Sequence, residues 1–145
     1  MNSVGHVQSL PPTLLLGGAG QLGLALCHLL DKEALWLPRR EETDLLNPGQ
    51  LVDLVERLKP RLIINAAAYT QVDLAQSEPE LAYQINAQSV AALAEATRRA
   101  GALLVHFSTD YVFDGGGDIP WREEDRPAPL NVYGLSKWQG EQAIQ

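Results

Sequence analysis

The sequence predicts an α/β fold built on a parallel sheet, and two features of the chain carry this prediction. Short apolar runs alternate with amphipathic helical segments from Thr13 onward, and such alternation indicates strands joined by helical crossovers. The runs are apolar throughout, as expected for strands that are buried on both faces. We therefore expect a three-layer, doubly wound parallel sheet of the Rossmann type, with ligands at the carboxyl ends of the strands.

The length and composition indicate one globular domain. The chain has 145 residues, of which 46% are hydrophobic, and a net charge of −7. This charge disfavours binding to nucleic acid or to an anionic membrane, since both need a basic surface. The single cysteine, Cys27, predicts a buried thiol in a reducing, cytoplasmic compartment. We expect residues 1–12 to form a flexible tail and residues 13–145 to form the domain.

Four strands are predicted from the apolar runs. The first, Thr13–Leu16, stands directly before a cluster of glycines. The others occupy residues 34–37, 61–65 and 102–108. Each run is four to seven residues long in this sequence, which is the usual length of a buried strand.

Helical segments separate these strands. The segment 21–30 is expected to bury Leu22, Ala25, Leu26 and Leu29 on one face. Asn47-Pro48 is typical of a helix start, and a long helix over about 79–99 is expected to stop at Gly101. A loop over about 109–131 then leads to a last helix over about 132–144.

The stretch Gly17–Gly23 (GGAGQLG) follows the first strand and opens the first helix. Its glycines allow a tight turn, a close approach of backbone to a pyrophosphate, and close packing of helix on strand. The backbone N–H groups at the start of the helix then face the phosphates. The position between strand and helix favours a dinucleotide site over a turn that binds nothing.

Two further segments lie where such a cofactor is held. Arg39-Arg40 follows the second strand and favours NADP over NAD, because an arginine accommodates the 2′-phosphate. The same residues are equally compatible with a solvated charged surface. Asp44 either reaches an adenine or caps a turn. The small side chains of Ala66–Ala68 follow the third strand and either accept a flat cofactor or allow close helix packing.

Candidate catalytic residues occur late in the chain. Ser108-Thr109-Asp110 ends the fourth strand, where a hydroxyl can bond a substrate carbonyl, although these are also ordinary turn residues. Tyr133 and Lys137 share a helical face at positions i and i+4. An ammonium near a phenol favours the phenolate, lowers the pKa of the phenol and thereby suits it for proton transfer.

With these residues in place, the chain resembles the extended short-chain dehydrogenase/reductases, and within them the dTDP-4-dehydrorhamnose reductase family. The resemblance covers about Thr13 to Gln145. It is carried by four stretches: GGAGQLG (17–23), NAAAYTQVDLAQSEPELAYQIN (65–86), STDYVFDG (108–115) and PWREEDRPAPLNVYGLSKWQGE (120–141).

The resemblance implies an NADP(H)-dependent reduction of the 4-keto group of dTDP-4-dehydro-L-rhamnose, with NAD(H) as a possible alternative cofactor. It implies a catalytic set of Thr109, which bonds the carbonyl oxygen, Tyr133, which protonates it, and Lys137, which holds the nicotinamide ribose. Asn86 matches a supporting asparagine. The cofactor contacts that it implies are Gly17, Gly20, Gln21, Leu22, Arg39, Asp44, Leu45, Ala66, Ala67, Ala68, Tyr133 and Lys137. No metal is expected.

Members of this family continue beyond these motifs with further strands and a lobe that grips the nucleotide-sugar. We therefore expect the chain to be a fragment with little turnover of its own. Its last helix is expected to expose an apolar face or to pair with another chain, giving a possible homodimer.

Two other functions stay open at this stage. One is a non-catalytic dinucleotide-binding subunit similar to the regulatory beta subunit of methionine adenosyltransferase, which shares these motifs. The other is an epimerase or dehydratase of the same superfamily, to which STDYVFDG (108–115) is less well suited.

Overall fold

The computed structural model describes residues 11–145, so that all but the last two residues of the predicted tail lie outside the described residues. A sheet of parallel strands in the order β2-β1-β3-β4 forms the centre of the fold. The strands are β1 (Thr13–Leu16), β2 (Leu35–Trp36), β3 (Leu62–Asn65) and β4 (Leu103–His106). The predicted doubly wound parallel sheet is confirmed.

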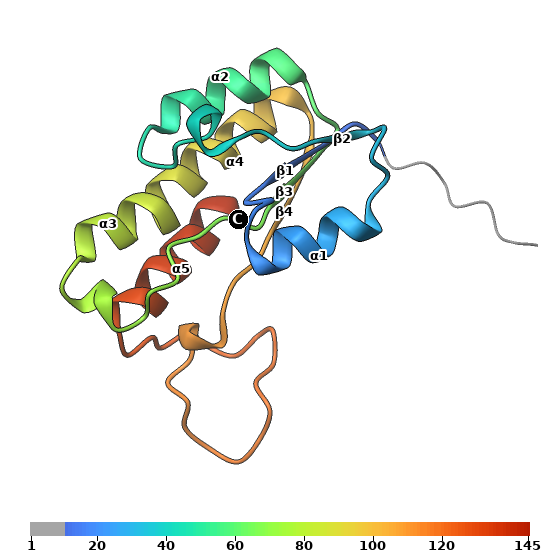
Figure 1. The fold of residues 1–145 in the computed structure, drawn as a ribbon. Coiled ribbons are helices and arrows are strands. Elements are labelled where there is room, and N and C mark those ends of the chain that lie inside the picture. The colour runs from blue at the N-terminus through green and yellow to red at the C-terminus, as the bar shows by residue number, and fades with distance from the viewer. Residues whose placement is uncertain (1–10) are drawn as a thin grey trace, which may run out of the picture.

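Helices lie on both faces of this sheet. They are α1 (Gln21–Leu29), α2 (Pro48–Leu58), α3 (Pro79–Tyr83), α4 (Ser89–Ala100) and α5 (Val132–Ile144). Shorter turns are the 3₁₀ segments η1 (Arg40–Glu42), η2 (Leu74–Gln76) and η4 (Asp110–Val112), and the π-helical segment η3 (Gln84–Gln88). Figure 1 shows α2, α4 and α5 on one side of the sheet and α1 on the other.

The main core lies between the sheet and the pair α2 and α4. Its buried members are Leu14, Leu16, Leu51, Leu54, Val55, Ile63, Leu93 and Ala96. Each large aliphatic side chain buried here contributes about 1.5–3 kcal/mol. This core fixes β1 against β3, and it therefore fixes the loops that follow both strands at the same edge of the sheet.

The long helix predicted over residues 79–99 is present but contains a π-helical segment. The chain runs through α3, the π-helical segment η3 and α4 without a break, and it ends as expected at Gly101 in a left-handed conformation. In the wider turn, the side chain of Asn86 points to Tyr69 and Ser136, while Leu93 still packs in the main core. The apolar spacing of the sequence does not encode this extra residue.

The predicted strand 102–108 is longer than β4, and the difference has a physical cause. The backbone oxygen of Phe107 accepts a hydrogen bond from Nζ of Lys137 at 2.6 Å, and the Ser108 hydroxyl donates to the Glu141 carboxylate. Both residues are therefore bound to α5 rather than to a neighbouring strand. The second observed strand is likewise shorter than predicted, since β2 covers only Leu35 and Trp36 of the predicted residues 34–37.

The apolar stripe expected on the first helix is not buried. Leu22 is 38% exposed and Leu29 is 80% exposed, and only Gly23 of α1 is buried. Cys27, predicted to be buried, is only partly so. The prediction is wrong because α1 lies on the other side of the sheet from the remaining helices in Figure 1, where only Gly23 of this helix is buried.

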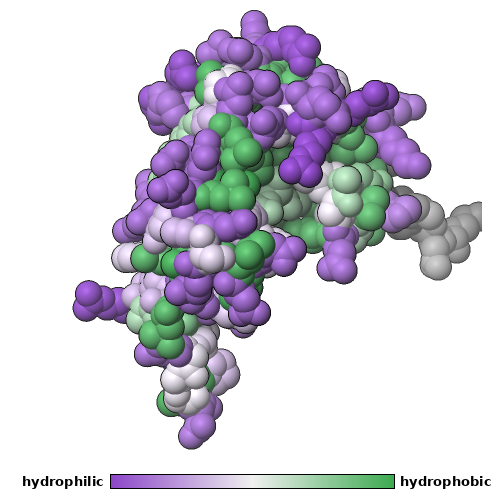
Figure 2. Space-filling view, turned by 60° about the vertical axis from the view of Figure 1, so that its left-hand side comes forward, coloured by the Kyte–Doolittle hydropathy of each residue, from purple (hydrophilic) through white to green (hydrophobic). Residues whose placement is uncertain are grey.

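The last helix, expected to expose an apolar face or to pair with another chain, leaves Ile144 36% exposed and Leu135 and Trp138 partly exposed. Helix α5 packs against η3 and α4 and buries Tyr133, Gly134, Ser136, Lys137 and Gly140. Exposed hydrophobic side chains also lie along β4 and at the residue after it; they are Leu103, Val105 and Phe107. Figure 2 shows hydrophobic residues gathered in the hollowed middle of one face of the molecule.

Two kinds of feature are absent from the part of the chain that the structure describes. Within residues 11–145, no helix is both long enough and apolar enough to span a membrane. The same residues contain no group of three or more His, Cys, Asp or Glu side chains that could hold a metal ion.

Candidate active site

The turn between β1 and α1 needs glycine at two positions for the sake of the protein itself. Gly17 has a φ of +80°, and a Cβ there would lie 2.6 Å from the backbone nitrogen of Ala67. A Cβ on Gly23 would overlap the backbone of Gly17. These two glycines therefore bring the turn against the loop after β3 and the helix against the turn.

Gly20 is different, because nothing in the described protein requires it to be glycine. Its φ is −79°, and a Cβ there would meet only the oxygen of Gly17, at 3.4 Å, which is an ordinary contact. The space beside Gly20 is therefore open to a ligand. A diphosphate fits this position, since the turn opens into the N-terminus of α1, which carries no acidic residue in its first turn.

Gln21 and Leu22 form the first turn of α1 and are exposed. Their backbone N–H groups belong to the four at a helix start that have no partner within the helix. The two residues therefore lie at the helix start beside the glycine turn, and their contact with a cofactor stays a prediction.

Ala66, Ala67 and Ala68 follow β3 at the same edge of the sheet. The backbone N–H of Ala66 donates to the oxygen of Leu16 at 3.0 Å, and that of Ala67 donates to Oδ1 of Asn65 at 3.1 Å. Ala67 also packs on the main core. The loop therefore lies beside the glycine turn and closes one wall of the space next to it.

Arg39 lies after β2 and is exposed, and no ion pair within residues 11–145 involves its guanidinium. Its backbone N–H donates to Oε2 of Glu42 at 3.0 Å, which closes η1. Asp44 closes a turn, since its Oδ1 accepts from the N–H of Leu46 at 3.0 Å. Leu45 packs on the main core. Asp44 and Leu45 thus have side-chain contacts within the protein, whereas the guanidinium of Arg39 has no ion-pair partner within residues 11–145.

Lys137 is the most deeply buried of the predicted catalytic residues, with only 2% of its surface exposed. Its Nζ lies 2.6 Å from the backbone oxygen of Phe107 and 3.4 Å from Nε2 of His106. Burial lowers the pKa of Lys137 to about 8, and the charge of Glu141 opposes this change. An amine with this pKa can change its protonation state close to neutral pH.

Tyr133 lies one turn before Lys137 in α5 and is 9% exposed. Its ring meets that of Tyr111 edge to face, with centroids 5.6 Å apart. Within residues 11–145 its hydroxyl makes no hydrogen bond, and every fully buried side-chain nitrogen or oxygen there has a partner. The hydroxyl therefore reaches the surface, where a substrate could meet it.

Thr109 is the N-cap residue of η4, three residues beyond the end of β4, and its Oγ1 accepts from the N–H of Tyr111 at 3.3 Å. It is thereby held next to the residue whose ring packs on Tyr133. The structure thus brings Thr109, Tyr133 and Lys137 to the carboxyl edge of the sheet, at which the glycine turn also lies.

Asn86 links the helical layer to this edge. Its side chain accepts from the N–H of Tyr69 at 2.9 Å and donates to the oxygen of the same residue at 3.0 Å. It also donates to Oγ of Ser136 at 3.0 Å. Because Ser136 precedes Lys137, Asn86 fixes both the loop after the alanines and the middle of α5.

Sequence reasoning missed His106 and Asn65, which lie directly beneath Lys137. The two residues are partners across β3 and β4, and Nδ2 of Asn65 lies 3.1 Å from Nδ1 of His106. The available signal was a polar residue at the end of each of two otherwise apolar strands. Burial and the nearby Lys137 lower the pKa of His106 to about 4, so that the imidazole is neutral at pH 7.

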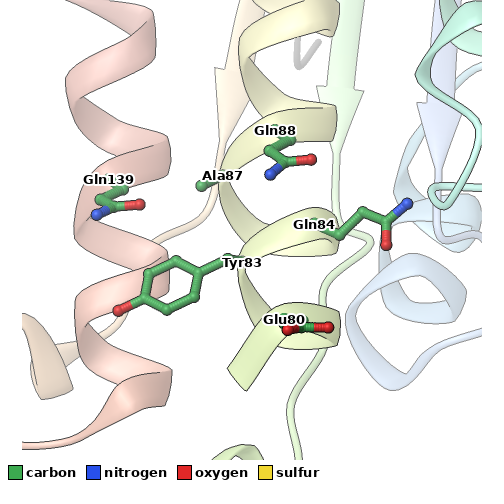
Figure 3. A pocket seen from close by; sticks show the side chains of 6 residues that line it. All are labelled: Glu80, Tyr83, Gln84, Ala87, Gln88 and Gln139. Atoms are coloured by element: carbon green, nitrogen blue, oxygen red, sulfur yellow. The ribbon is translucent and has the colours of Figure 1, made fainter. Parts of the chain in front are cut away.

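One open groove lies elsewhere, on the outer surface of α3, η3 and α5. Figure 3 shows its six side chains: Glu80, Tyr83, Gln84, Ala87, Gln88 and Gln139. None of the predicted catalytic or cofactor-binding residues lines it. The chemistry of the carboxyl edge, rather than this groove, therefore marks the candidate active site.

Comparisons with known proteins find relatives over most of the described chain. The family model described as the RmlD substrate binding domain matches residues 12–145. The dTDP-4-dehydrorhamnose reductase of Salmonella typhimurium strain LT2 is 50% identical over 137 residues, which cover 91% of this chain and 46% of that protein. That of Escherichia coli strain K12 is 54% identical over 102 residues, or 70% of this chain and 34% of that protein.

Solved structures give the same result. The dTDP-4-dehydrorhamnose reductase of Bacillus anthracis, in complex with NADP, aligns with a TM-score of 0.88 at 40% identity, over 92% of this chain and 48% of that one. RMD from Pseudomonas aeruginosa, complexed with NADPH, aligns with a TM-score of 0.77 at 29% identity, over 92% and 48% of the two chains.

The chain spans about half the length of the curated relatives and solved structures that it matches. Within that span, the family model covers nearly every residue that the structure describes. The chain therefore belongs to the RmlD family, the family of the dTDP-4-dehydrorhamnose reductases.

Proposed function

We propose that this chain carries the cofactor-binding part and the catalytic residues of an NADP(H)-dependent reductase that converts dTDP-4-dehydro-L-rhamnose to dTDP-L-rhamnose. The observation that carries the proposal is the burial of Lys137 at the carboxyl edge of the sheet. Its Nζ lies 2.6 Å from the backbone oxygen of Phe107, and Phe107 is two residues before Thr109. Lys137 itself is one helical turn from Tyr133. Lysine side chains are rarely buried as deeply as Lys137, which is 2% exposed, and such burial is typical of functional sites.

Three side chains have roles in this proposal. The hydroxyl of Tyr133, which reaches the surface, donates a proton to the substrate oxygen. The hydroxyl of Thr109 donates a hydrogen bond to the same oxygen. Lys137 holds the ribose of the cofactor and tunes Tyr133 for proton transfer. NADPH, when bound, supplies the hydride that the carbonyl carbon receives.

The cofactor would be held by the residues around the glycine turn. The open space beside Gly20 and the N-terminus of α1 suit a diphosphate. Arg39, which has no ion-pair partner within residues 11–145, would accept the 2′-phosphate of NADP. The NADP and NADPH complexes of the two solved relatives support this preference.

The function is tested in a chimaera because the chain spans about half the length of its relatives. Residues 12–145 replace the matching part of the Salmonella typhimurium reductase, with which they are 50% identical. The chimaera should oxidise NADPH in the presence of the dTDP-keto-sugar. Tyr133→Phe should reduce the rate by about 10²–10⁴-fold, which is the usual contribution of a general acid.

Tyr111→Phe is the matched control, since it removes a hydroxyl from the other ring of the same pair and should leave the rate nearly unchanged. An active chimaera that tolerates Tyr133→Phe would contradict the catalytic assignment. A folded chimaera that binds NADPH but shows no turnover would favour a dinucleotide-binding subunit without enzyme activity.

The proposal includes a dTDP-sugar as the substrate, a homodimer as the assembled form and the cytoplasm as the location. The homodimer is tested by sedimentation of the purified chain. The lone cysteine, which has no second cysteine to pair with in this sequence, supports a reducing compartment.

A further inference from the structure

Asn65 and His106, the polar residues beneath Lys137, form a connected set of contacts. Asn65 and His106 are direct neighbours on paired strands, and Asn65 is 2% exposed. Three contacts connect them in series: the N–H of Ala67 with Oδ1 of Asn65, Nδ2 of Asn65 with Nδ1 of His106, and Nε2 of His106 with Nζ of Lys137. The series begins at a loop that lines the glycine turn and ends at Lys137.

The first contact fixes the orientation of the Asn65 amide. A backbone N–H can only donate, so the atom of Asn65 that lies 3.1 Å from the nitrogen of Ala67 must be the oxygen. The amide nitrogen, which can only donate, then faces His106 at 3.1 Å. Turning the amide over would set two donors against each other at Ala67.

The second contact fixes the tautomer of His106. A donor from Asn65 requires Nδ1 to be an acceptor, and a neutral imidazole then carries its proton on Nε2. The imidazole is neutral at pH 7, since burial and Lys137 lower the pKa of His106 to about 4. The N–H at Nε2 therefore points toward the nitrogen of Lys137, 3.4 Å away.

We propose that Asn65 and His106 are positioning residues that hold a hydrogen-bond donor against Lys137 and thereby favour its neutral amine. An ammonium at this position would face a second donor, whereas an amine has a lone pair that accepts from Nε2–H. The backbone oxygen of Phe107 accepts from Lys137 in either state, so this contact holds the nitrogen in place without fixing its charge.

Three charged or titratable groups lie around Lys137, and they act on its protonation in different directions. Glu141, one turn further along α5, favours the ammonium. Tyr133 lies one turn before, and His106 faces the amine from β4. The burial that lowers the pKa of Lys137 to about 8 therefore acts in the same direction as His106 and against Glu141.

The meaning of this arrangement for catalysis rests on the proposed reductase function. A lysine that is close to its pKa at neutral pH can give up and regain a proton during a reaction, whereas an ordinary lysine, with a pKa of about 10.4, stays charged. In the reduction proposed above, Lys137 would thus take part in the return of a proton to the site as well as in holding the cofactor.

The first test needs no substitution. In the ¹⁵N-labelled chain, long-range ¹H–¹⁵N spectra distinguish the two nitrogens of an imidazole. For His106 at pH 7 we expect a protonated Nε2 and an unprotonated Nδ1, unchanged down to about pH 5 because the pKa is low. A proton on Nδ1 would overturn the proposal, since Asn65 would then not donate to it.

The second test reverses the tautomer. In Asn65→Asp, one carboxylate oxygen can still accept from the N–H of Ala67, while the other can only accept from His106. The proton of His106 should move to Nδ1, and the titration of Lys137, followed by its ¹³Cε shift, should move up by about one unit or more. A neutral imidazole that keeps its proton on Nε2 in this variant, with Nδ1 unprotonated, would show that Asn65 does not set the tautomer.

Glu141→Gln separates charge from tautomer. It removes a carboxylate that favours the ammonium, so the pKa of Lys137 should fall while the proton of His106 stays on Nε2. None of these readouts needs cofactor or substrate. A failure of the reductase assay would therefore leave this inference intact, and a wrong tautomer would leave the proposed function intact.

Discussion

Gly140 of α5 lies directly against the backbone oxygen of Asn86, so that a Cβ at this position would overlap that oxygen. The contact joins α5 to the π-helical segment η3. The backbone of a helical segment cannot move aside easily. Gly140→Ala should lower the free energy of unfolding by about 1–3 kcal/mol, the usual range for overpacking. Urea denaturation measures this change.

The control for Gly140→Ala is Gln142→Ala, at an exposed position of the same helix. It gains helix propensity without meeting a neighbour, and its stability should stay within about 0.5 kcal/mol of the original chain. Equal stability of the two variants would mean that α5 and η3 can separate without loss.

Gly20→Ala should reduce dinucleotide binding while the fold remains intact. The added Cβ meets only an ordinary contact with Gly17 in the protein, but it enters the space proposed for the diphosphate. Calorimetric titration with NADPH should show a loss of at least about tenfold in affinity, equal to roughly 1.4 kcal/mol. Gly20→Val should abolish binding.

Gly23→Ala is the contrasting variant, since its Cβ would overlap the backbone of Gly17. It should lower the stability of the chain in urea, whereas Gly20→Ala should not. Normal NADPH binding by Gly20→Ala and Gly20→Val would remove Gly20 from the cofactor site and leave it as a residue of the turn.

The stability of the chain should rise with pH in an alkaline window because of Lys137. Burial lowers the pKa of this lysine from 10.5 to about 8. Between these two values the folded chain has released the proton and the unfolded chain still holds it, so the free energy of unfolding increases with pH. The increase should approach about 3 kcal/mol across the window.

Other lysines and tyrosines titrate in the same range, so the comparison is with Lys137→Met. The difference in the free energy of unfolding between the original chain and this variant, measured in urea at a series of pH values, isolates Lys137. A difference that does not change with pH would show that Lys137 keeps an ordinary proton affinity when folded.

Asn86→Ala should destabilise the chain more than its single lost side chain suggests. It leaves the N–H and oxygen of Tyr69 without their partner. It also removes the bond that the Ser136 hydroxyl accepts, although this hydroxyl still donates to the oxygen of Tyr133 at 2.7 Å. Each unsatisfied buried group costs about 1–3 kcal/mol, partly relieved by entering water. We expect a loss of about 2–4 kcal/mol in thermal or urea unfolding.

Gln88→Ala, at an exposed position of the same π-helical segment, is the control and should change little. Similar effects of the two substitutions would mean that the contacts of Asn86 are replaced by water at no cost, and that the loop at Tyr69 is held by other means.

Arg39→Ala should weaken binding of NADPH by about 10–100-fold, corresponding to the roughly 1.5–3 kcal/mol of a hydrogen bond to a charged group. Binding of NADH, which lacks the 2′-phosphate, should change little. Calorimetry with both dinucleotides measures the selectivity. Arg98→Ala, which removes an arginine paired with Glu95 on α4, should alter neither affinity. Unchanged preference in Arg39→Ala would refute the assignment.

The parallel sheet and the helical pair of Tyr133 and Lys137 could be predicted from sequence because both follow from local spacing. Apolar runs of four residues identify buried strands, and residues four apart share a helical face. The carboxyl edge then follows from the parallel topology alone. Predicting these features needs no knowledge of which distant residues contact one another.

The contact of Lys137 with His106 and Asn65 could not be predicted in this way. It needs the register in which Asn65 faces His106, two residues that lie 41 positions apart. The exposure of Leu22 and Leu29 was missed for a related reason, because a helical stripe shows which face is apolar but not whether another element covers it.

The π-helical segment also bears on how sequences of this family can change length. A π turn holds one residue more than an α turn, and such turns inside α-helices are frequent at functional sites. Deleting one residue between Gln84 and Gln88 would restore an ordinary helix and rotate Asn86 away from Tyr69 by roughly 100°, the angle per residue of an α-helix. A one-residue gap here in an aligned homologue would therefore signal a changed site, even where every catalytic residue is retained.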